Sequence, residues 1–437
     1  RITAVRRPLA VFGALQLAVG ISAILVLFVF ARLPTLIQMF TSVPDYATEL
    51  VVELFTSAIT IFVPTFLLGT LFPVAARIYG EREGQPGADA GSAGTLVGRL
   101  YALNTFGAML GALAAGFVLI PVIGLQRSAV FLAAVNLAVG LAAFLLVQPL
   151  RLIARRTLAG LAGATIVAIA AVLLLPPGYY LGFREGATPQ LIFYDEGVDA
   201  TVAVFEVKSP PLKVSFVNGR NEVPTDAQSM RAFYVLGHLP ALLKPDARQA
   251  LMVSFGNGIA TGAMARHHIA HIQAVELVAG QVKAARLYSA ENRNVLENPA
   301  VQIAHEDGRN YLLQSSERYD IITADATHPI NTSSWALFTT EFYTLVKQHL
   351  ADDGVFVQWL PFHDLAREDY RSIVGTFRNV FPHTTLFYTG GVHTFLVATP
   401  QPLTRDQVAA LDSRIQALGI GDDLGDGARL AGDMLMD

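Results

Sequence analysis

The chain has 437 residues, enough for two or three domains, and is 53% hydrophobic but only 15% charged, which is too apolar for an ordinary soluble protein. Its net charge of −4 is distributed unevenly, because residues 1–176 contain 11 Arg, no Lys, no His and 6 acidic residues, whereas residues 177–437 are acidic and contain all ten His. The acidic second part argues against nucleic acid as a partner, since nucleic acid requires a basic protein face. The absence of cysteine excludes disulfides and thiolate metal sites.

The first part, residues 1–176, is predicted to be a transmembrane domain of about five helices. Five apolar stretches reach the roughly 20 residues that a spanning helix needs, and none resembles a signal peptide. They are Pro8–Phe30, Val51–Val74, Leu100–Ile123, Ala129–Leu150 and Leu158–Leu175. We therefore expect a multi-pass protein of the cell (inner) membrane that contacts the lipid bilayer.

The third apolar stretch contains Gly107, Gly111 and Ala115 at four-residue spacing, which predicts close contact with another helix. Asn104 in the same stretch is expected to face another helix as well. No stretch carries a charge near its middle, so we expect a packed anchor and not an ion path.

The side of the membrane on which the second part lies stays open. The flanking arginines place the N-terminus in the cytoplasm, and five spans would then put the second part outside. A nucleoside-type cosubstrate, however, is expected inside.

A small β unit is predicted for residues 177–225, ahead of the main domain. Strands are expected at Leu191–Tyr194, Ala200–Val207 and Leu212–Val217, and Asn218-Gly219 is a hairpin turn signal. Ala227–Leu243 has apolar residues at helical spacing and is followed by Lys244-Pro245, which ends the predicted helix.

Residues 226–400 are predicted to form an α/β Rossmann-like domain that binds a nucleoside. Four apolar runs of strand length each carry glycine or an acidic residue near their C-terminal end or lead into one: Ala250–Phe255, Ile272–Val278, Val301–Ala304 and Tyr319–Ala324. The corresponding residues are Gly256 and Gly258, Glu276, Asp307 and Asp325. Ligands of doubly wound sheets bind outside the carboxyl ends of the strands, and a carboxylate after the second strand suits the ribose hydroxyls.

Further elements complete this domain. Helices are predicted at Ile259–Arg266, Gln281–Ala290, Thr340–His349 and Glu368–Val380, a buried strand at Gly354–Gln358, and a hairpin at Thr385–Tyr388 and Thr394–Thr399. The tail, residues 401–437, is predicted to be mostly helical. No metal site is expected, because His267, His268 and His271 do not share one continuous helical face.

The second part resembles the spermidine synthase (aminopropyltransferase) family of class I S-adenosylmethionine-dependent folds over roughly Leu191–Pro400. The matching segments are Asn218-Gly219, Gly237-His238-Leu239-Pro240, the glycine loop, Val275-Glu276-Leu277, Glu306-Asp307-Gly308-Arg309, Tyr319-Asp320-Ile321-Ile322, Asp325 to Pro329, Leu337-Phe338-Thr339 and Glu341-Phe342-Tyr343. Arg99-Leu100-Tyr101-Ala102-Leu103-Asn104-Thr105 is similar to membrane-fused members, in which further helices precede the first one here. The resemblance thus implies that the chain is a fragment.

The resemblance implies the roles of particular residues. Glu276 would bind the ribose hydroxyls of decarboxylated S-adenosylmethionine or S-adenosylmethionine, and Asp307-Gly308 the adenine amino group. The loop of Gly256, Asn257 and Gly258 would approach the ligand's tail. Asp325 would accept a proton from the attacking amine, and His328 could relay that proton.

The chain departs from the family at two of these positions. Asn257 stands where the family loop has Asp, and His328 where the Asp-Ser-Ser-Asp-Pro motif has its second Asp. Three functions therefore stay open: an aminopropyltransferase with a small amine acceptor, an S-adenosylmethionine-dependent methyltransferase or sulfonium-cleaving enzyme, and a non-catalytic nucleoside-binding subunit. A homodimer or a membrane complex is the expected assembly.

Overall fold

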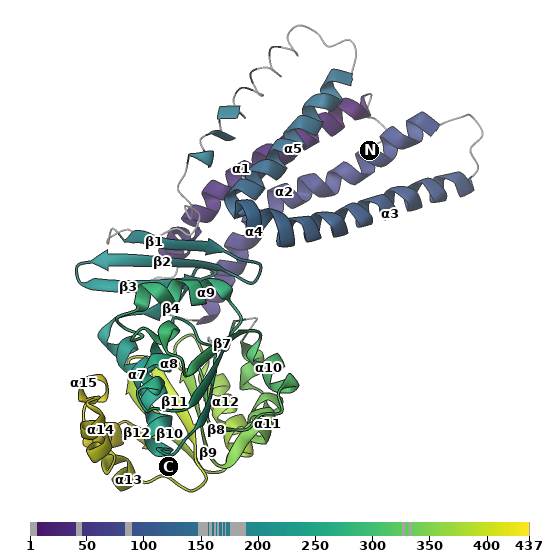
Figure 1. Cartoon of the computed structure of the whole chain (residues 1–437). Coiled ribbons are helices and arrows are strands. Elements are labelled where there is room, and N and C mark those ends of the chain that lie inside the picture. Colours follow the sequence, from purple (N-terminus) through teal and green to yellow (C-terminus); the bar gives the residue numbers. More distant parts are fainter. Residues whose placement is uncertain are drawn as a thin grey trace. The chain divides into compact units, whose positions relative to one another are not determined.

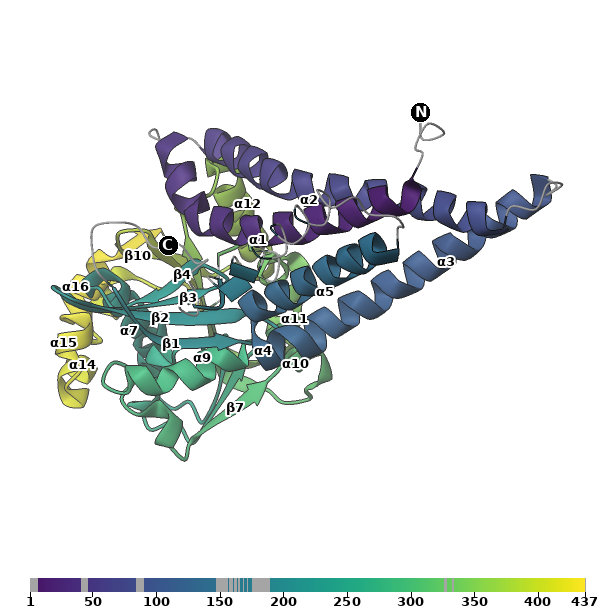
Figure 2. The same cartoon turned by 90° about the horizontal axis from the view of Figure 1, so that it is seen from above.

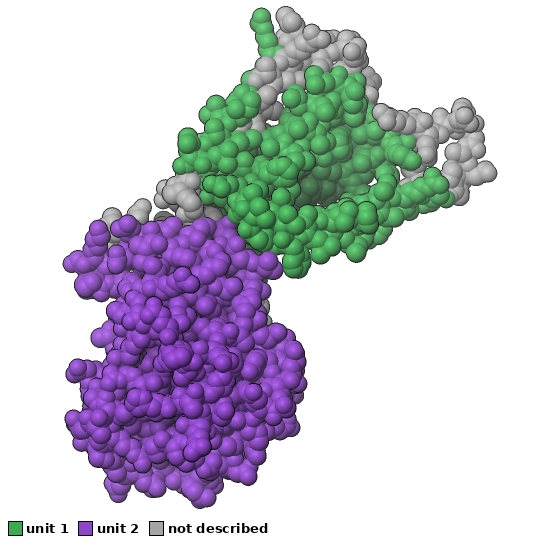
Figure 3. All heavy atoms as spheres, in the orientation of Figure 1, with its two compact units in different colours: residues 1–187 green, residues 188–437 purple. Residues whose placement is uncertain are grey.

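The computed structural model describes residues 7–40, 46–83, 90–146, 189–325, 328–331 and 334–436, together with scattered residues between 156 and 174. The chain forms two compact units, Arg1–Ala187 and Thr188–Asp437 (Figure 3). A helical part followed by a Rossmann-like domain confirms the predicted order of fold classes.

The described part of the first unit consists of long apolar helices. They are α1 (Pro8–Phe40), α2 (Tyr46–Glu83), α3 (Ala90–Ala114), the π-helical turn η2 (Ala115–Leu119), α4 (Ile120–Ile123) and α5 (Leu125–Leu146). Four segments of these helices are long and apolar enough to cross a membrane: Pro8–Phe30, Leu50–Tyr79, Val97–Ile123 and Leu125–Leu146. Half of the fifth predicted span, Leu158–Leu175, falls outside the described residues.

Glycines bring α1 and α5 close together, and these two helices lie side by side in both views (Figures 1 and 2). A Cβ on Gly140 would lie 2.8 Å from the carbonyl oxygen of Gly13, and a Cβ on Gly20 2.6 Å from Leu137 Cγ. The close contact predicted for Gly107 and Gly111 was wrong for the described part of the chain, because a Cβ at either would meet nothing within 4 Å. Asn104 is likewise exposed. Small-residue spacing marks a face that can pack closely, but not the pair of helices that does so.

The second unit begins with a four-stranded antiparallel sheet in the order β1-β2-β3-β4. Its strands are β1 (Gln190–Glu196), β2 (Thr201–Lys208), β3 (Pro211–Val217) and β4 (Arg220–Pro224). Asn218 and Gly219 connect β3 to β4 with φ values of +51° and +80°, as a two-residue hairpin turn requires. The sequence did not predict β4, because Arg220, Asn221 and Glu222 lack the apolar alternation of a strand and depend on pairing with β3.

The main sheet has eight strands in the order β12-β10-β11-β9-β8-β5-β6-β7. The parallel strands are β5 (Gln249–Val253), β6 (His271–Glu276), β7 (Val301–His305), β8 (Tyr319–Ala324) and β9 (Leu350–Pro361). The antiparallel strands are β10 (Thr384–Gly390), β11 (His393–Ala398) and β12 (Met434–Met436). The chain runs from β5 outward to β7 and then returns to β8 on the other side of β5, so β5 and β8 border the switch point where such sheets bind ligands.

Helices cover both faces of this sheet (Figure 1). On β5, Ala250 and Met252 pack on one face with α7 (Ala227–Leu243) and α8 (Ile259–Ala265), while Leu251 and Val253 pack on the other. That second face is covered by α10 (Gly308–Gln314), α11 (Thr340–His349) and α12 (Arg367–Val380). The strands are buried on both faces, which explains why they appear in the sequence as continuous apolar runs.

The C-terminal tail packs on the face of the main sheet that α7 and α8 cover. Its elements are α13 (Arg405–Ala409), α14 (Asp412–Leu418), α15 (Gly421–Leu424), α16 (Gly427–Gly432) and β12. Ile415, Ile420 and Leu424 are fully buried in the same core as α7. Arg231 on α7 forms an ion pair with Asp433 at 2.6 Å, so the tail belongs to the same compact unit.

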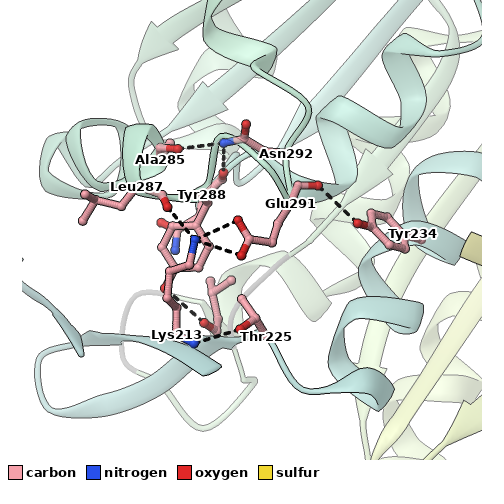
Figure 4. Close-up of polar contacts among 10 residues, drawn as sticks. Lys213, Thr225, Tyr234, Ala285, Leu287, Tyr288, Glu291 and Asn292 are labelled. Atoms are coloured by element: carbon pink, nitrogen blue, oxygen red, sulfur yellow. Dashed lines mark hydrogen bonds and ion pairs between the residues drawn. The ribbon is translucent and has the colours of Figure 1, made fainter. Parts of the chain in front are cut away.

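The small sheet is joined to the main domain by a group of polar contacts around Lys213 of β3 (Figure 4). Lys213 Nζ donates to the carbonyl of Leu287 at 2.7 Å, forms an ion pair with Glu291 at 2.9 Å, and lies 5.1 Å from the ring centroid of Tyr288. These partners lie in and just after η4 (Ala285–Tyr288), which follows α9 (Ala279–Ala284). The contacts fix the β3–β4 hairpin relative to the main sheet, which decides where β4 can place Glu222.

Candidate active site

Two cavities meet at the carboxyl ends of β5 and β6. The inner cavity, of ≈ 100 Å³, includes Asp325, Trp359 and His393 in its lining. The outer cavity, of ≈ 270 Å³, includes Glu306, Asp307, Gly308 and Asn331. Five residues line both cavities: Val217, Glu222, Ser254, Glu276 and Val278. A ligand in the outer cavity can therefore extend a group past Glu222 and Glu276 into the inner one.

The glycine loop after β5 forms part of this junction. Ser254, Gly256 and Gly258 all have positive φ, of +67°, +56° and +77°. At Gly258 a Cβ would also come within 2.5 Å of the Phe255 ring, so only glycine fits where the loop enters α8. The loop turns the N–H of Gly256 toward Glu276, whose Oε2 accepts it at 2.8 Å.

Glu276 ends β6 and is 7% exposed. Its other carboxylate oxygen, Oε1, accepts the N–H of Val278 at 2.8 Å. Burial raises the pKa of Glu276, and the two backbone hydrogen bonds oppose that shift. A carboxylate fixed from both sides in this way presents its remaining lone pairs to the cavity in one orientation, as recognition of paired hydroxyls requires.

Asp307 caps the N-terminus of α10, at the rim of the outer cavity. Its Oδ1 accepts the N–H groups of Arg309 at 3.0 Å and Asn310 at 2.9 Å. The next residue must be glycine, because a Cβ on Gly308 would lie 2.5 Å from Val253 Cγ1. Helix capping accounts for one oxygen of Asp307 and leaves its predicted adenine contact a prediction.

Asp325 follows β8 directly, and its N–H is bound to the carbonyl of Val253 at 2.9 Å. This hydrogen bond places its side chain beside the end of β5, where it lines the inner cavity. Burial, followed by the nearby charge of Glu276, raises the pKa of Asp325 to about 7. At neutral pH its carboxyl group can therefore both accept and release a proton, which suits a general base.

Glu222 on β4 is a site residue that the sequence prediction missed. It lines both cavities, and its Oε1 accepts a hydrogen bond from Asn331 Nδ2 at 3.4 Å. Burial, followed by the charge of Asp325, raises its pKa to about 7. The Asn218-Gly219 turn was the available signal, because a hairpin turn after β3 implies a return strand beginning at Arg220.

Comparisons with known proteins identify the family to which this part of the chain is similar. Residues 233–401 match the family model of the spermine/spermidine synthase domain. The polyamine aminopropyltransferases of Yersinia pestis (strain Pestoides F) and Yersinia pseudotuberculosis (serotype O:1b, strain IP 31758) are each 28% identical over 195 residues. The match covers 43% of this chain and 66% of each relative. The second unit contains a spermidine synthase-like domain.

Solved structures to which this chain is similar include a spermidine synthase in complex with the transition-state analogue AdoDATO and the spermidine synthase of Thermotoga maritima. They have TM-scores of 0.46 and 0.45, identities of 20% and 19%, and each comparison covers 54% of this chain and 88% of the other. Because both scores are below 0.5, the assignment of the spermidine synthase-like domain depends on the family model and the curated relatives. The predicted family resemblance is thereby confirmed.

The two positions at which this domain departs from the family, Asn257 and His328, are absent from the lining of both cavities. Asn257 is 2% exposed and is absent from the lining of both cavities, and its carbonyl accepts Asn292 Nδ2 at 2.9 Å. His328 Nε2 donates to the carbonyl of His363 at 2.7 Å, and its Nδ1 accepts the N–H of Ile330 at 3.3 Å. Burial lowers the pKa of His328, so the ring is neutral and holds the loop after Asp325. The ligand-tail role of Asn257 and the proton-relay role of His328 stay predictions.

His328 also belongs to a group whose nitrogen and oxygen atoms lie within 4.8 Å of one another, together with His363 and Asp364. Such a group could in principle hold a metal ion. Here both nitrogens of His328 are already hydrogen-bonded to backbone groups. The group therefore fits a loop-stabilising role better than a metal centre.

Proposed function

We propose that the protein transfers an aminopropyl group from decarboxylated S-adenosylmethionine to a small amine. The observation that carries this proposal is the junction of the two cavities. One side offers the fixed carboxylates Glu276 and Asp307, and the other offers Asp325, whose pKa is about 7, inside an apolar cavity. The relatives named above are aminopropyltransferases, which supports the same reaction.

The outer cavity suits the nucleoside of the donor. Glu276 would accept hydrogen bonds from the two ribose hydroxyls, and Asp307, next to the close-packed Gly308, from the adenine amino group. The sulfonium would then lie at the junction beside Ser254 and Gly256, where the backbone approaches closely. Its aminopropyl chain would point into the inner cavity.

In the inner cavity, Asp325 would accept a proton from the ammonium form of the acceptor. The nitrogen lone pair then attacks the carbon attached to the sulfonium, and the carbon–sulfur bond breaks with its electron pair passing to sulfur. The products are neutral methylthioadenosine and a secondary ammonium that carries the new aminopropyl group. Because the sulfonium is already a good leaving group, the enzyme contributes mainly position and the removal of one proton.

Four apolar helices in the first unit suggest membrane association, and we propose that they anchor this activity at the cell membrane, as a homodimer or within a larger membrane complex. The full chain in lipid nanodiscs, supplied with a linear four-carbon diamine and decarboxylated S-adenosylmethionine, should release methylthioadenosine and aminopropylated amine in equal amounts. Full S-adenosylmethionine should support neither product. Formation of S-adenosylhomocysteine from it would instead identify a methyltransferase.

A further inference from the structure

Glu222 is a half-buried carboxylate at the junction that the reaction just described does not use. It lies on β4 of the small sheet, so it reaches the junction from a different part of the chain than Glu276 and Asp325. It lines the inner and the outer cavity at once. Any ligand group that passes from one cavity to the other must therefore pass Glu222.

The inner cavity has an excess of negative charge. Its ionisable lining residues in the described chain are Glu222, Glu276, Asp325 and His393. His393 accepts a hydrogen bond from Trp359 Nε1 at 3.2 Å, and burial lowers its pKa to about 4, so it is neutral at physiological pH. Glu276 is bound to Gly256 and Val278. Glu222 and Asp325 are left as two carboxylates with no cation among the described lining residues.

A residue on the loop that follows Asp325 holds the side chain of Glu222 in place. Asn331 on that loop donates its side-chain amide to Glu222 Oε1 at 3.4 Å. Arg220, which lines only the outer cavity, lowers the pKa of Glu222 but is outweighed by burial and by the charge of Asp325. Glu222 and Asp325 therefore approach each other from two elements that are tied together, and two like charges in such a place favour binding of a cation between them.

The walls of the inner cavity are apolar, which determines the kind of cation. Phe233, Leu236, Phe395 and the ring of Trp359 line it. An aliphatic chain is stabilised by leaving water for such walls. Among the described residues, the ligand atoms of Glu222, Glu276 and Asp325 do not form a group close enough together to hold a metal ion. An alkylammonium has a positive charge that suits the two carboxylates and an apolar chain that suits the apolar walls.

We propose that Glu222 is the ammonium-binding residue of the junction and makes the site selective for amine ligands. This inference rests on the proposed function, which supplies the identity of the ligands. The positive charge of the ligands follows from the carboxylates of the cavity alone. Two ligands carry a suitable ammonium, the aminopropyl tail of the donor and the acceptor amine. A carboxylate in this position also repels the carboxylate of full S-adenosylmethionine, which would account for selection of the decarboxylated donor.

The test is calorimetry on the full chain and on Glu222→Gln, which keeps the shape and the contact with Asn331 but removes the charge. Three ligands are compared: decarboxylated S-adenosylmethionine, a linear four-carbon diamine added with methylthioadenosine, and methylthioadenosine alone, which has no ammonium. Glu222→Gln should weaken binding of at least one of the amines by roughly 10–100-fold, the loss of a charge-assisted hydrogen bond. Binding of methylthioadenosine should change by less than about twofold, since it makes no such bond.

The ligand that loses affinity identifies which ammonium Glu222 binds. Glu206→Gln is the matched control, because Glu206 lies on β2 of the same sheet and lines neither cavity. Glu222→Asp should recover part of the lost affinity. Equal affinities for all three ligands in wild type and Glu222→Gln would overturn the inference, and so would a parallel loss for methylthioadenosine, which would indicate a structural role. Because binding is read without turnover, a chain that binds amines through Glu222 but transfers no aminopropyl group would refute the proposed function alone.

Discussion

Glu276 and Asp307 are held in a different way from Glu222 and Asp325. Glu276 and Asp307 each accept two backbone N–H groups, which fix the orientation of the carboxylate. Glu222 and Asp325 instead lie in a poorly solvated cavity, and both have a pKa of about 7. A backbone-fixed carboxylate is suited to recognise hydroxyl and amino groups, whereas one with a pKa near neutrality is suited to accept protons or bind cations. In the proposed reaction, Glu276 and Asp307 would bind the nucleoside, whereas Glu222 and Asp325 would act on the amine.

Asp325→Asn tests this contrast with the largest expected effect. Loss of the general base should lower turnover by roughly 10²–10⁴-fold, while nucleoside affinity should stay within about tenfold, because Asp325 lines only the inner cavity. Binding and turnover are measured on the same sample. In the wild type, kcat/KM should rise with pH through about 7, as Asp325 loses its proton.

The opposite results are equally informative. Turnover that survives in Asp325→Asn would rule out the general-base role and favour a methyltransferase or a non-catalytic binding subunit. A collapse of nucleoside affinity would instead place Asp325 in the binding half of the site, and the contrast between the two cavities would fail.

Glu276→Gln tests the binding half and should have a smaller effect. Replacing the carboxylate weakens its hydrogen bonds to the ribose, so we expect nucleoside affinity to fall by about 1–3 kcal/mol, as for a buried charge-assisted hydrogen bond. Calorimetry with methylthioadenosine measures this loss, and circular dichroism checks that the variant keeps the overall secondary structure of the wild type. Unchanged affinity would remove Glu276 from the nucleoside site.

The pH dependence of stability is the smallest expected effect. The pKa values of Glu222 and Asp325 are raised by folding, so the folded state binds more protons than the unfolded state between about pH 4 and pH 7. Their contribution to the free energy of unfolding is therefore most favourable at low pH and is lost as the pH rises through about 7. Asp325→Asn should raise the Tm at pH 8 by roughly 2–4 °C, the shift that about 1 kcal/mol produces in a domain of this size. At pH 5 the two proteins should differ less, and a lower Tm for the variant at pH 8 would contradict the buried-charge explanation.

The amino-acid sequence by itself determined the order of the domains and most of their elements. Apolar stretches of spanning length identified the helical part, and apolar strands ending on Gly256, Glu276, Asp307 and Asp325 identified the Rossmann-like domain. These features are local in the chain, since a strand buried on both faces must be apolar along its whole length. The glycine of a strained turn is also visible locally, as at Gly258, where a side chain would collide with Phe255.

Features that depend on pairing between distant segments were decided only by the tertiary structure. The sequence marked Gly107 and Gly111 as a packing face, but the close contact in the described helices is between Gly13 and Gly140. It assigned roles to Asn257 and His328, whose side chains are buried or bound to the backbone. It assigned no role to Glu222, because that residue lies in a polar segment that follows the Asn218-Gly219 turn and becomes a strand only by pairing with β3. Sequence spacing fixes which side chains share an element, whereas the meeting of Glu222 with Asp325 depends on how two sheets are joined, and no local pattern encodes that contact.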